Sequence, residues 1–166
     1  SSPYWTYTFN SNDATQFIFA NSDAQGPSSV TRTTLTSPPI DLSVYVSASF
    51  SFWQYYRYVS GDTAIIEVST DGTNWTTVET FLSSQRSGVN FVQHTVNLDA
   101  YIGNPNLQIR FNYQSNWGYG WAIDNLEVSA AISLEVQWSP DTELYTDAAA
   151  TIPYVLGTPV GIVFAK

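Results

Sequence analysis

Apolar side chains recur at every second residue in several separate runs of this sequence. The run from Val46 to Phe52 places Phe50 and Phe52 on one face and serines on the other. Residues 92–98 and 107–114 alternate in the same way. Because successive side chains of a β-strand point to opposite faces, each run predicts a strand with one buried face.

Turn-forming residues separate these runs at intervals of roughly ten residues. The segments Ser60–Asp62 and Asp71–Asn74 combine glycine with Asp or Asn, which tolerate the positive φ of hairpin turns. No segment joins helix start and stop signals to a helical apolar period. Many short strands at this spacing predict an all-β protein, and their number fits an antiparallel jelly-roll β-sandwich.

Composition narrows the function classes. The net charge is −9 and the few basic residues are scattered, which disfavours nucleic acid and anionic membranes as partners. The chain lacks cysteine, which excludes disulfides and thiolate sites, and it contains a single histidine, His94. No apolar run approaches the roughly 20 residues that span a bilayer. Low charge (11%) and many aromatics (16%) favour an extracellular, bacterial β-protein, and the start at Ser1 suggests a processed or excised segment.

The last part of the chain has a different pattern. A small-residue joint, Ser129–Ala131, is followed by a strand-like segment from Ile132 to Trp138. Residues 154–164 have room for one or two further strands. We therefore expect a jelly-roll sandwich over residues 1–128 and a short C-terminal β-appendage over residues 129–166. This appendage is a tail packed on the main domain, the start of a following Ig-like or linker repeat, or a strand that pairs with a neighbouring subunit.

Three stretches, in this order along the chain, resemble motifs of MAM-like and carbohydrate-module-like jelly rolls. Residues 35–43 read Leu-Thr-Ser-Pro-Pro-Ile-Asp-Leu-Ser, and residues 68–76 contain the hairpin Ser-x-Asp-Gly-x-x-Trp. Residues 121–128 read Trp-Ala-Ile-Asp-Asn-Leu-Glu-Val, similar to the closing strand of these domains. Residues 136–154 are similar to linking repeats in large Bacteroidetes surface proteins that are exported by type IX secretion. The resemblance implies an adhesin-like module of a bacterial cell-surface or secreted protein.

The resemblance also implies a structural calcium site. In these jelly rolls an acidic residue that opens the last strand joins oxygens from the first strand and its following loop, and Asp124 falls at that position. Alternation with Ala122 and Leu126 predicts that Asp124 points inward, where a lone carboxylate is costly. Partners could come from Asn10, Asn12, Asp13, Asn21 or Asp23, and of these we expect Asn10 and Asp23. The alternative is that Asp124 accepts hydrogen bonds from backbone amides or from an arginine.

Aromatic and polar residues suggest two places for a ligand. Trp53, Tyr55 and Arg57 continue the outward face of their predicted strand, and Arg110 and Asn112 lie on the polar face of another. If these strands are neighbours, they form a platform for a glycan or peptide. The alternative is that the aromatics pack within the sandwich. Trp117 and Tyr119, in a glycine-rich loop before Trp121, are further candidate contacts.

Features of catalytic sites are missing from the sequence. Most of the Asp and Glu residues fall in segments that resemble turns. The sequence contains no nucleophile elbow, no zinc-binding His pair and no phosphate-binding loop. We therefore expect a non-catalytic extracellular binding or adhesion module that contacts a glycan, a surface protein or copies of itself. The alternatives are a structural repeat or filament subunit, whose residues 132–166 pair with a neighbouring copy, and an accessory domain of a secreted hydrolase.

Overall fold

The computed structural model describes residues 9–133, 144–146, 148–155 and 164–165. The chain divides into two compact units, Ser1–Ile132 and Ser133–Lys166. In the second unit, the described strands β9 (Leu144–Tyr145) and β10 (Phe164–Ala165) pair antiparallel. The assignment of this unit to a tail or to a following repeat stays a prediction. No helix within the described residues is long and apolar enough to cross a membrane.

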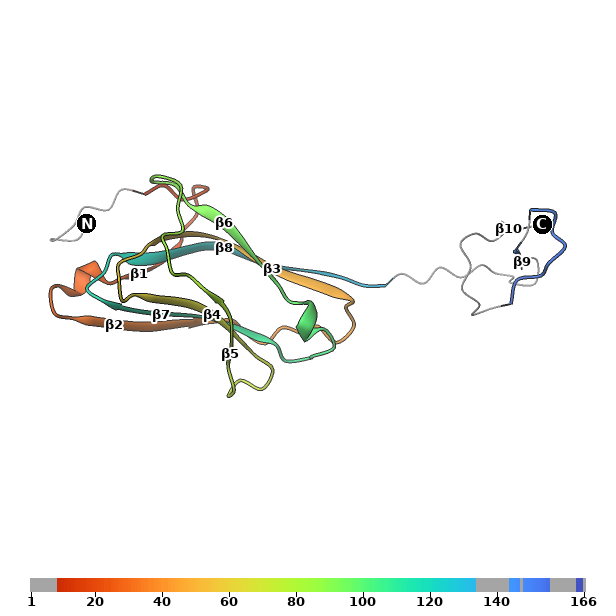
Figure 1. The fold of residues 1–166 in the computed structure, drawn as a ribbon, viewed down its shortest axis with the longest axis horizontal. Coiled ribbons are helices and arrows are strands. Elements are labelled where there is room, and N and C mark those ends of the chain that lie inside the picture. Colours follow the sequence, from red (N-terminus) through yellow and green to blue (C-terminus); the bar gives the residue numbers. More distant parts are fainter. Residues whose placement is uncertain (1–8, 134–143, 147, 156–163, 166) are drawn as a thin grey trace. The chain divides into compact units, whose positions relative to one another are not determined.

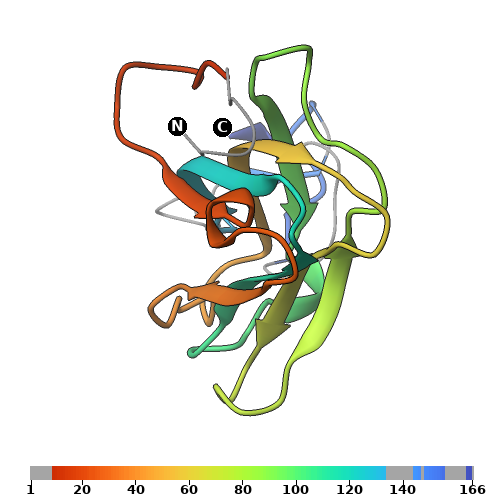
Figure 2. The same cartoon turned by 90° about the vertical axis from the view of Figure 1, so that its left-hand side faces the viewer.

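The first unit is a sandwich of two antiparallel sheets (Figures 1 and 2). Its strands are β1 (Ile18–Asn21), β2 (Val30–Thr36), β3 (Ser47–Arg57), β4 (Thr63–Ser69), β5 (Thr76–Thr80), β6 (Val92–Asn97), β7 (Gln108–Asn116) and β8 (Gly120–Ala131). One sheet has the order β1-β8-β3-β6 and the other the order β2-β7-β4-β5. Every connection except the β4–β5 hairpin crosses between the sheets, which is jelly-roll connectivity. The predicted all-β jelly-roll sandwich is therefore confirmed.

The main core lies between the two sheets. Phe52, Tyr56 and Ile66 are fully buried there, and the indole of Trp121 donates a hydrogen bond to Oε1 of Gln54 at 2.8 Å. Buried apolar side chains from both sheets form a single cluster around them. The two-residue alternation in β3 and β7 thus reflects one face of each sheet turned toward the other sheet.

Strand β8 changes the direction of its side chains at Asn125, which has a φ of 46°. Before this residue, Ile123 packs in the core while Ala122 packs on the outer face against Tyr55. The register between β3 and β8 shifts at the same level, and Asp124 pairs with Trp53. Asp124 therefore lies on the outer face of its sheet. The predicted inward direction of Asp124 is wrong because Ala122, on the same face, packs outward against Tyr55, and the bulge after Asp124 turns Leu126 to the opposite face.

Candidate binding surfaces

The predicted ligand-binding residues do not form one platform. Strands β3 and β7 belong to different sheets, so Trp53 and Tyr55 lie on the opposite side of the sandwich from Arg110 and Asn112. The expectation that these strands are neighbours is wrong. The candidates divide among two outer faces and one end of the sandwich.

The outer face of the β2-β7-β4-β5 sheet carries a group of four residues, Trp75, Arg110, Glu67 and Asn112, which we call the Arg110 platform. The guanidinium carbon of Arg110 lies 4.0 Å from the centroid of the Trp75 ring. Nε of Arg110 donates a hydrogen bond to Oε2 of Glu67 at 2.9 Å, and Nδ2 of Asn112 donates to the same oxygen at 3.1 Å. The indole, the guanidinium and the amide are therefore fixed beside one another.

Charge and hydrogen bonding stabilise the ionised form of Glu67. Burial acts to raise the pKa of Glu67, but the hydrogen bonds from Arg110 and Asn112 and the charge of Arg110 outweigh it and hold the pKa below its usual value. Glu67 and Arg110 therefore form an ion pair, with the carboxylate largely covered and the guanidinium side chain 23% exposed. The platform has a fixed charge arrangement while one edge of Arg110 faces solvent.

A tight turn between β4 and β5 places Trp75 on this platform. Oδ1 of Asp71 accepts hydrogen bonds from the backbone N–H groups of Thr73 (2.8 Å) and Asn74 (2.7 Å). Gly72 has a φ of 72°, and a Cβ at this position would lie 2.9 Å from Oε1 of Gln108. Asp71 is thus a turn former, as the sequence indicates, and its function is to position Trp75.

The outer face of the β1-β8-β3-β6 sheet is largely covered by aromatic residues. Tyr55 faces outward from β3, but it is only 4% exposed because Phe9 stacks on it with ring centroids 4.9 Å apart. Phe19 and Phe91 complete this cluster, and Trp53 packs at its margin with part of its side chain exposed. Tyr55 is therefore not available to a ligand, and its prediction as a contact residue is corrected.

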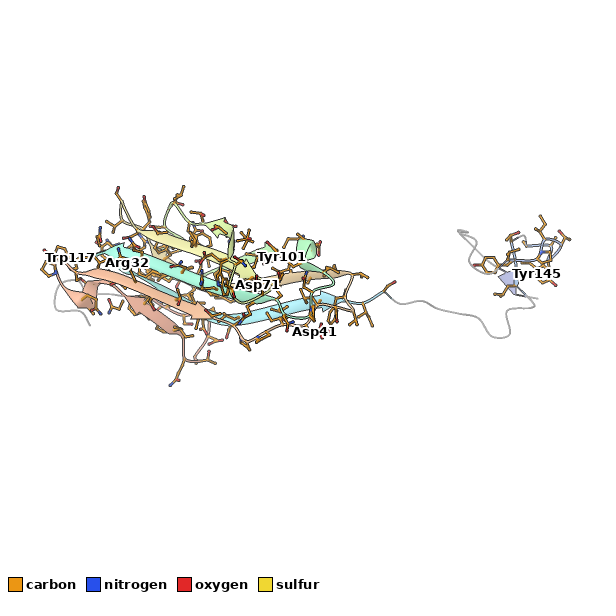
Figure 3. All side chains as sticks on the ribbon, turned by 90° about the horizontal axis from the view of Figure 1, so that it is seen from below. Arg32, Asp41, Asp71, Tyr101, Trp117 and Tyr145 are labelled. Carbon is orange, nitrogen blue, oxygen red and sulfur yellow. The ribbon has the colours of Figure 1, made fainter. Side chains whose placement is uncertain are left out.

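One end of the sandwich brings Arg57 and Tyr119 together. The guanidinium carbon of Arg57 lies 3.3 Å from the centroid of the Tyr119 ring. Trp117 has a φ of 51° and lies at this end, away from Asp71 (Figure 3). This arrangement agrees with the expectation that Trp117 and Tyr119 share a loop. The arginine beside this loop is Arg57, and Arg110 lies on the other sheet.

A buried carboxylate supports the same loop. The N–H of Gly118 donates a hydrogen bond to Oγ of Ser115 at 2.8 Å, and a Cβ on Gly118 would lie 2.6 and 2.7 Å from the oxygens of Asp62. Asp62 accepts a hydrogen bond from the N–H of Val59. Burial raises the pKa of Asp62, and burial together with the charge of Asp62 also raises the pKa of Tyr56.

The three predicted calcium ligands do not converge. Oδ2 of Asp124 accepts a hydrogen bond from Oγ of Ser11 at 2.6 Å, and the side chain of the adjacent Asn10 donates to Asn90. Asp23 is buried at the other end of β1, where its N–H donates to the carbonyl of Tyr119. Tyr119 is five residues from Asp124, or roughly 17 Å along an extended strand. Asp124, Asn10 and Asp23 therefore do not fit a shared calcium ion.

No group of three or more His, Cys, Asp or Glu residues suited to a metal occurs in the described part of the chain. One carboxylate does lie near Asp124, because Nδ2 of Asn125 donates a hydrogen bond to Oδ2 of Asp13 at 2.6 Å. His94 packs against the Phe52 and Phe81 rings and lies 3.2 Å from Oε2 of Glu79. His94 is thus a packed histidine with a carboxylate partner.

Two residues with a role in these surfaces escape analysis of the sequence. Trp75 is visible only as part of the hairpin motif, and nothing local shows that it stacks on Arg110, 35 residues away. Arg86 lies in the loop before β6, and its guanidinium carbon is 5.7 Å from the Tyr55 ring centroid. Both contacts depend on how the strands pair. The sequence shows only that a tryptophan and an arginine are present, and it does not show which residues they contact.

Comparison with known proteins gives distant structural likenesses. No family model matches the chain, and no curated protein sequence matches it. Among solved structures, the carbohydrate-binding module TmCBM61 in complex with β-1,4-galactotriose is 14% identical, with 69% of this chain and 81% of that chain covered and a TM-score of 0.45. The enzymatically active domain of bacteriophage CBA120 tailspike protein 4 is 15% identical, with 77% and 19% covered and a TM-score of 0.44. The infectious bursal disease virus Gt strain structure is 17% identical, with 70% and 32% covered and a TM-score of 0.33.

Proposed function

We propose that this chain is a non-catalytic extracellular binding module of a bacterial cell-surface or secreted protein, and that its Arg110 platform contacts a glycan. The observation that carries the proposal is the stacking of Arg110 on Trp75 while Glu67 holds the guanidinium from the side. The stacked indole and guanidinium together form one fixed flat surface, with hydrogen-bond donors at the edge of the guanidinium. Sugars need both, because their C–H faces stack on aromatic rings and their hydroxyls bond to polar groups.

The hydrogen-bonding pattern leaves donors for a ligand. The bond to Glu67 uses Nε of Arg110, and in the described residues no other hydrogen bond involves this guanidinium. Asn112 lies on the same side and is held by the same carboxylate. Because Glu67 already orders both side chains, a ligand does not have to immobilise them, which reduces the entropic cost of binding.

The experiment begins with a glycan array probed with the 166-residue chain, followed by calorimetric titration of the best oligosaccharide. We expect Trp75→Ala and Arg110→Ala each to weaken binding by about tenfold or more, which corresponds to about 1.4 kcal/mol. Trp53→Ala is the matched control, because it removes a half-exposed tryptophan from the opposite outer face. Wild-type affinity in both platform variants, with their melting temperatures unchanged, would exclude this surface.

A second function, a structural repeat that accepts a strand from a neighbouring copy, is favoured by the edge of β8. Strand β1 pairs with residues Gly120–Ile123 of β8, and among the described residues no strand continues this pairing toward Ala131. An apolar groove of about 340 Å³, lined in part by Leu35, Phe50 and Leu126, opens beside this edge. An added strand would satisfy the free backbone groups there.

The occupant in this second proposal is residues 133–166 of the next copy, whose sequence contains strand-type segments. Light scattering of the full chain and of a chain ending at Ile132 tests it. We expect the full chain to associate with increasing concentration and the shortened chain to remain monomeric. Monomers in both cases would exclude strand exchange. The precursor sequence would show whether this module instead accompanies a secreted hydrolase.

A further inference from the structure

The arginines of this chain differ in whether they have a polar partner. Arg110 pairs with Glu67, and Nε of Arg32 donates a hydrogen bond to Oε1 of Gln114 at 3.0 Å. Arg57 has no hydrogen bond or ion pair within the described part of the chain, and Arg86 bonds only to the backbone carbonyl of Gly88. Two guanidiniums therefore lack a carboxylate partner in a protein whose net charge is −9.

These two guanidiniums share one face of the sandwich. Arg57 and Tyr55 lie two residues apart on β3, so they point to the same side, roughly 7 Å apart along the strand. Tyr56 and Gln85 exchange both backbone hydrogen bonds at 2.9 Å, which places the next residue, Arg86, opposite Tyr55. The observed position of Arg86 over the Tyr55 ring agrees with this pairing.

Both arginines rest on aromatic rings that are themselves held in place. Tyr119 lies under Arg57, and its carbonyl accepts the N–H of Asp23. Tyr55 lies under Arg86 and is buried against Phe9. Stacking orients a guanidinium and leaves the N–H donors at its edge available, which suits the planar binding of an oxyanion.

The charges around the pair do not neutralise it. Two acidic residues of β8 lie on this face. Asp124 is opposite Trp53 and accepts hydrogen bonds from Ser11 and from the N–H of Asn125, and Glu127 is opposite Ser51, six residues before Arg57. Trp53 is four residues from Arg57, or roughly 13 Å along β3. Asp62 lies within hydrogen-bond distance of Val59 and is buried, so it belongs to the interior of this end.

We propose that Arg57 and Arg86 form a binding site for an acidic oligosaccharide, whose carboxylate or sulfate groups contact the two guanidiniums, one at each end of the site. The partly exposed Tyr119 ring borders the site and supplies apolar surface for a sugar ring. Two arginines on separate rings match two spaced acidic groups, whereas the net negative charge of the whole chain repels a densely charged polymer such as nucleic acid. This site is separate from the Arg110 platform, which lies on the other sheet.

The test titrates the 166-residue chain with three oligosaccharides of equal length: a galacturonate oligomer, a sulfated galactan oligomer and a neutral glucose oligomer. We expect binding of at least one acidic probe, weakened more than fivefold when the salt concentration is raised from 0.1 to 0.5 M, since screening shortens the range of the interaction. The acidic probe that binds identifies carboxylate or sulfate as the recognised group. Absence of binding to both acidic probes at millimolar concentration would overturn the proposal.

Variants locate the site. Arg57→Gln and Arg86→Gln should each weaken the acidic probe several-fold and together by more than tenfold. Arg57→Lys should fall between wild type and Arg57→Gln, because it keeps the charge but loses the planar donors. Arg32→Gln is the control for charge, and Arg110→Ala distinguishes this site from the platform. Wild-type binding by the folded double variant, or an equal loss in Arg32→Gln, would overturn the assignment.

Discussion

The carboxylate of Asp71 and the backbone N–H of Asn74 are joined by a hydrogen bond of 2.7 Å, and this bond closes the turn that carries Trp75 to Arg110. Asp71, in an exposed turn, thereby determines where Trp75 lies on the Arg110 platform. The side chain of Asn74 also donates to Oδ2 of Asp71 at 2.7 Å, so both carboxylate oxygens are engaged.

Asp71→Ala should therefore impair the platform and the stability of the hairpin together. These hydrogen bonds hold the pKa of Asp71 well below its usual value. A carboxylate with a lowered pKa stabilises the fold above its unfolded pKa, 3.8, and this contribution is lost as the pH falls through the lower folded value. We expect the variant to melt below wild type at pH 7, with the difference shrinking under acid conditions, and to bind the platform ligand more weakly.

Asp41→Ala is the matched control for this experiment. Asp41 also accepts a turn hydrogen bond, from the N–H of Ser43 at 2.9 Å, and its pKa is also lowered by contacts with Ser43. It lies outside the Arg110 platform, so its loss should lower stability without changing ligand affinity. Equal losses of affinity in the two variants would show that Asp71 acts through global stability alone.

Asp62 should have the opposite pH dependence. Burial raises its pKa, so the folded state binds this proton more tightly than the unfolded chain. The favourable contribution is complete below the unfolded pKa of 3.8 and is lost as the pH rises through the higher folded value. Asp62→Asn removes the charge while keeping an acceptor for Val59. We expect the variant to melt a few degrees above wild type at pH 7 and to lose this advantage near pH 4.

Differential scanning calorimetry between pH 3 and pH 7 measures this difference. Asp99→Asn is a suitable control, because the N–H of Ala48 and the side chain of Asn97 lower the pKa of Asp99 and its contribution therefore has the opposite sign. A pH-independent difference between wild type and Asp62→Asn would show that the burial of this carboxylate carries no charge penalty.

The alternation of apolar residues predicts the class of fold well because it is a local property. Residues 46–52, 92–98 and 107–114 became β3, β6 and β7, and the jelly-roll prediction was confirmed. The same pattern does not determine which strands are neighbours. The order of the strands depends on connections that cross between the sheets. For this reason the prediction that Tyr55 and Arg110 share one surface is wrong.

Two local irregularities also lie beyond what periodicity predicts. Asp124 lies on the same face as Ala122, which packs outward. The bulge at Asn125 turns Leu126 to the other face, so the apolar neighbours of Asp124 do not predict its direction. Tyr55 follows the expected outward alternation, but Phe9, far away in sequence, covers it. Alternation predicts the side of a sheet on which a residue lies, whereas its exposure depends on distant segments.

The calcium prediction can be tested at Asp124 without assuming a ligand set. Asp124 tethers the segment before β1 through Ser11, so Asp124→Asn should lower the melting temperature even in calcium-free buffer. If calcium binds at Asp124, a chelator should lower the melting temperature of wild type and leave Asp124→Asn unchanged. Asp23→Asn is the control, because the structure places Asp23 at the other end of β1, too far away to share an ion with Asp124. A wild-type melting temperature that does not respond to chelator would contradict calcium binding.

Replacing Tyr55 distinguishes a packing role from a ligand contact. Tyr55 is 4% exposed and contacts the rings of Phe9 and Phe91, so Tyr55→Ala should lower the free energy of unfolding by about 3 kcal/mol, as measured by urea denaturation. Tyr55→Phe keeps the ring and should remain close to wild type. Because Phe9 covers this ring, glycan affinity on the Arg110 platform should not change in either variant. A stable Tyr55→Ala protein that has lost glycan binding would instead support the exposed aromatic face that the sequence predicts.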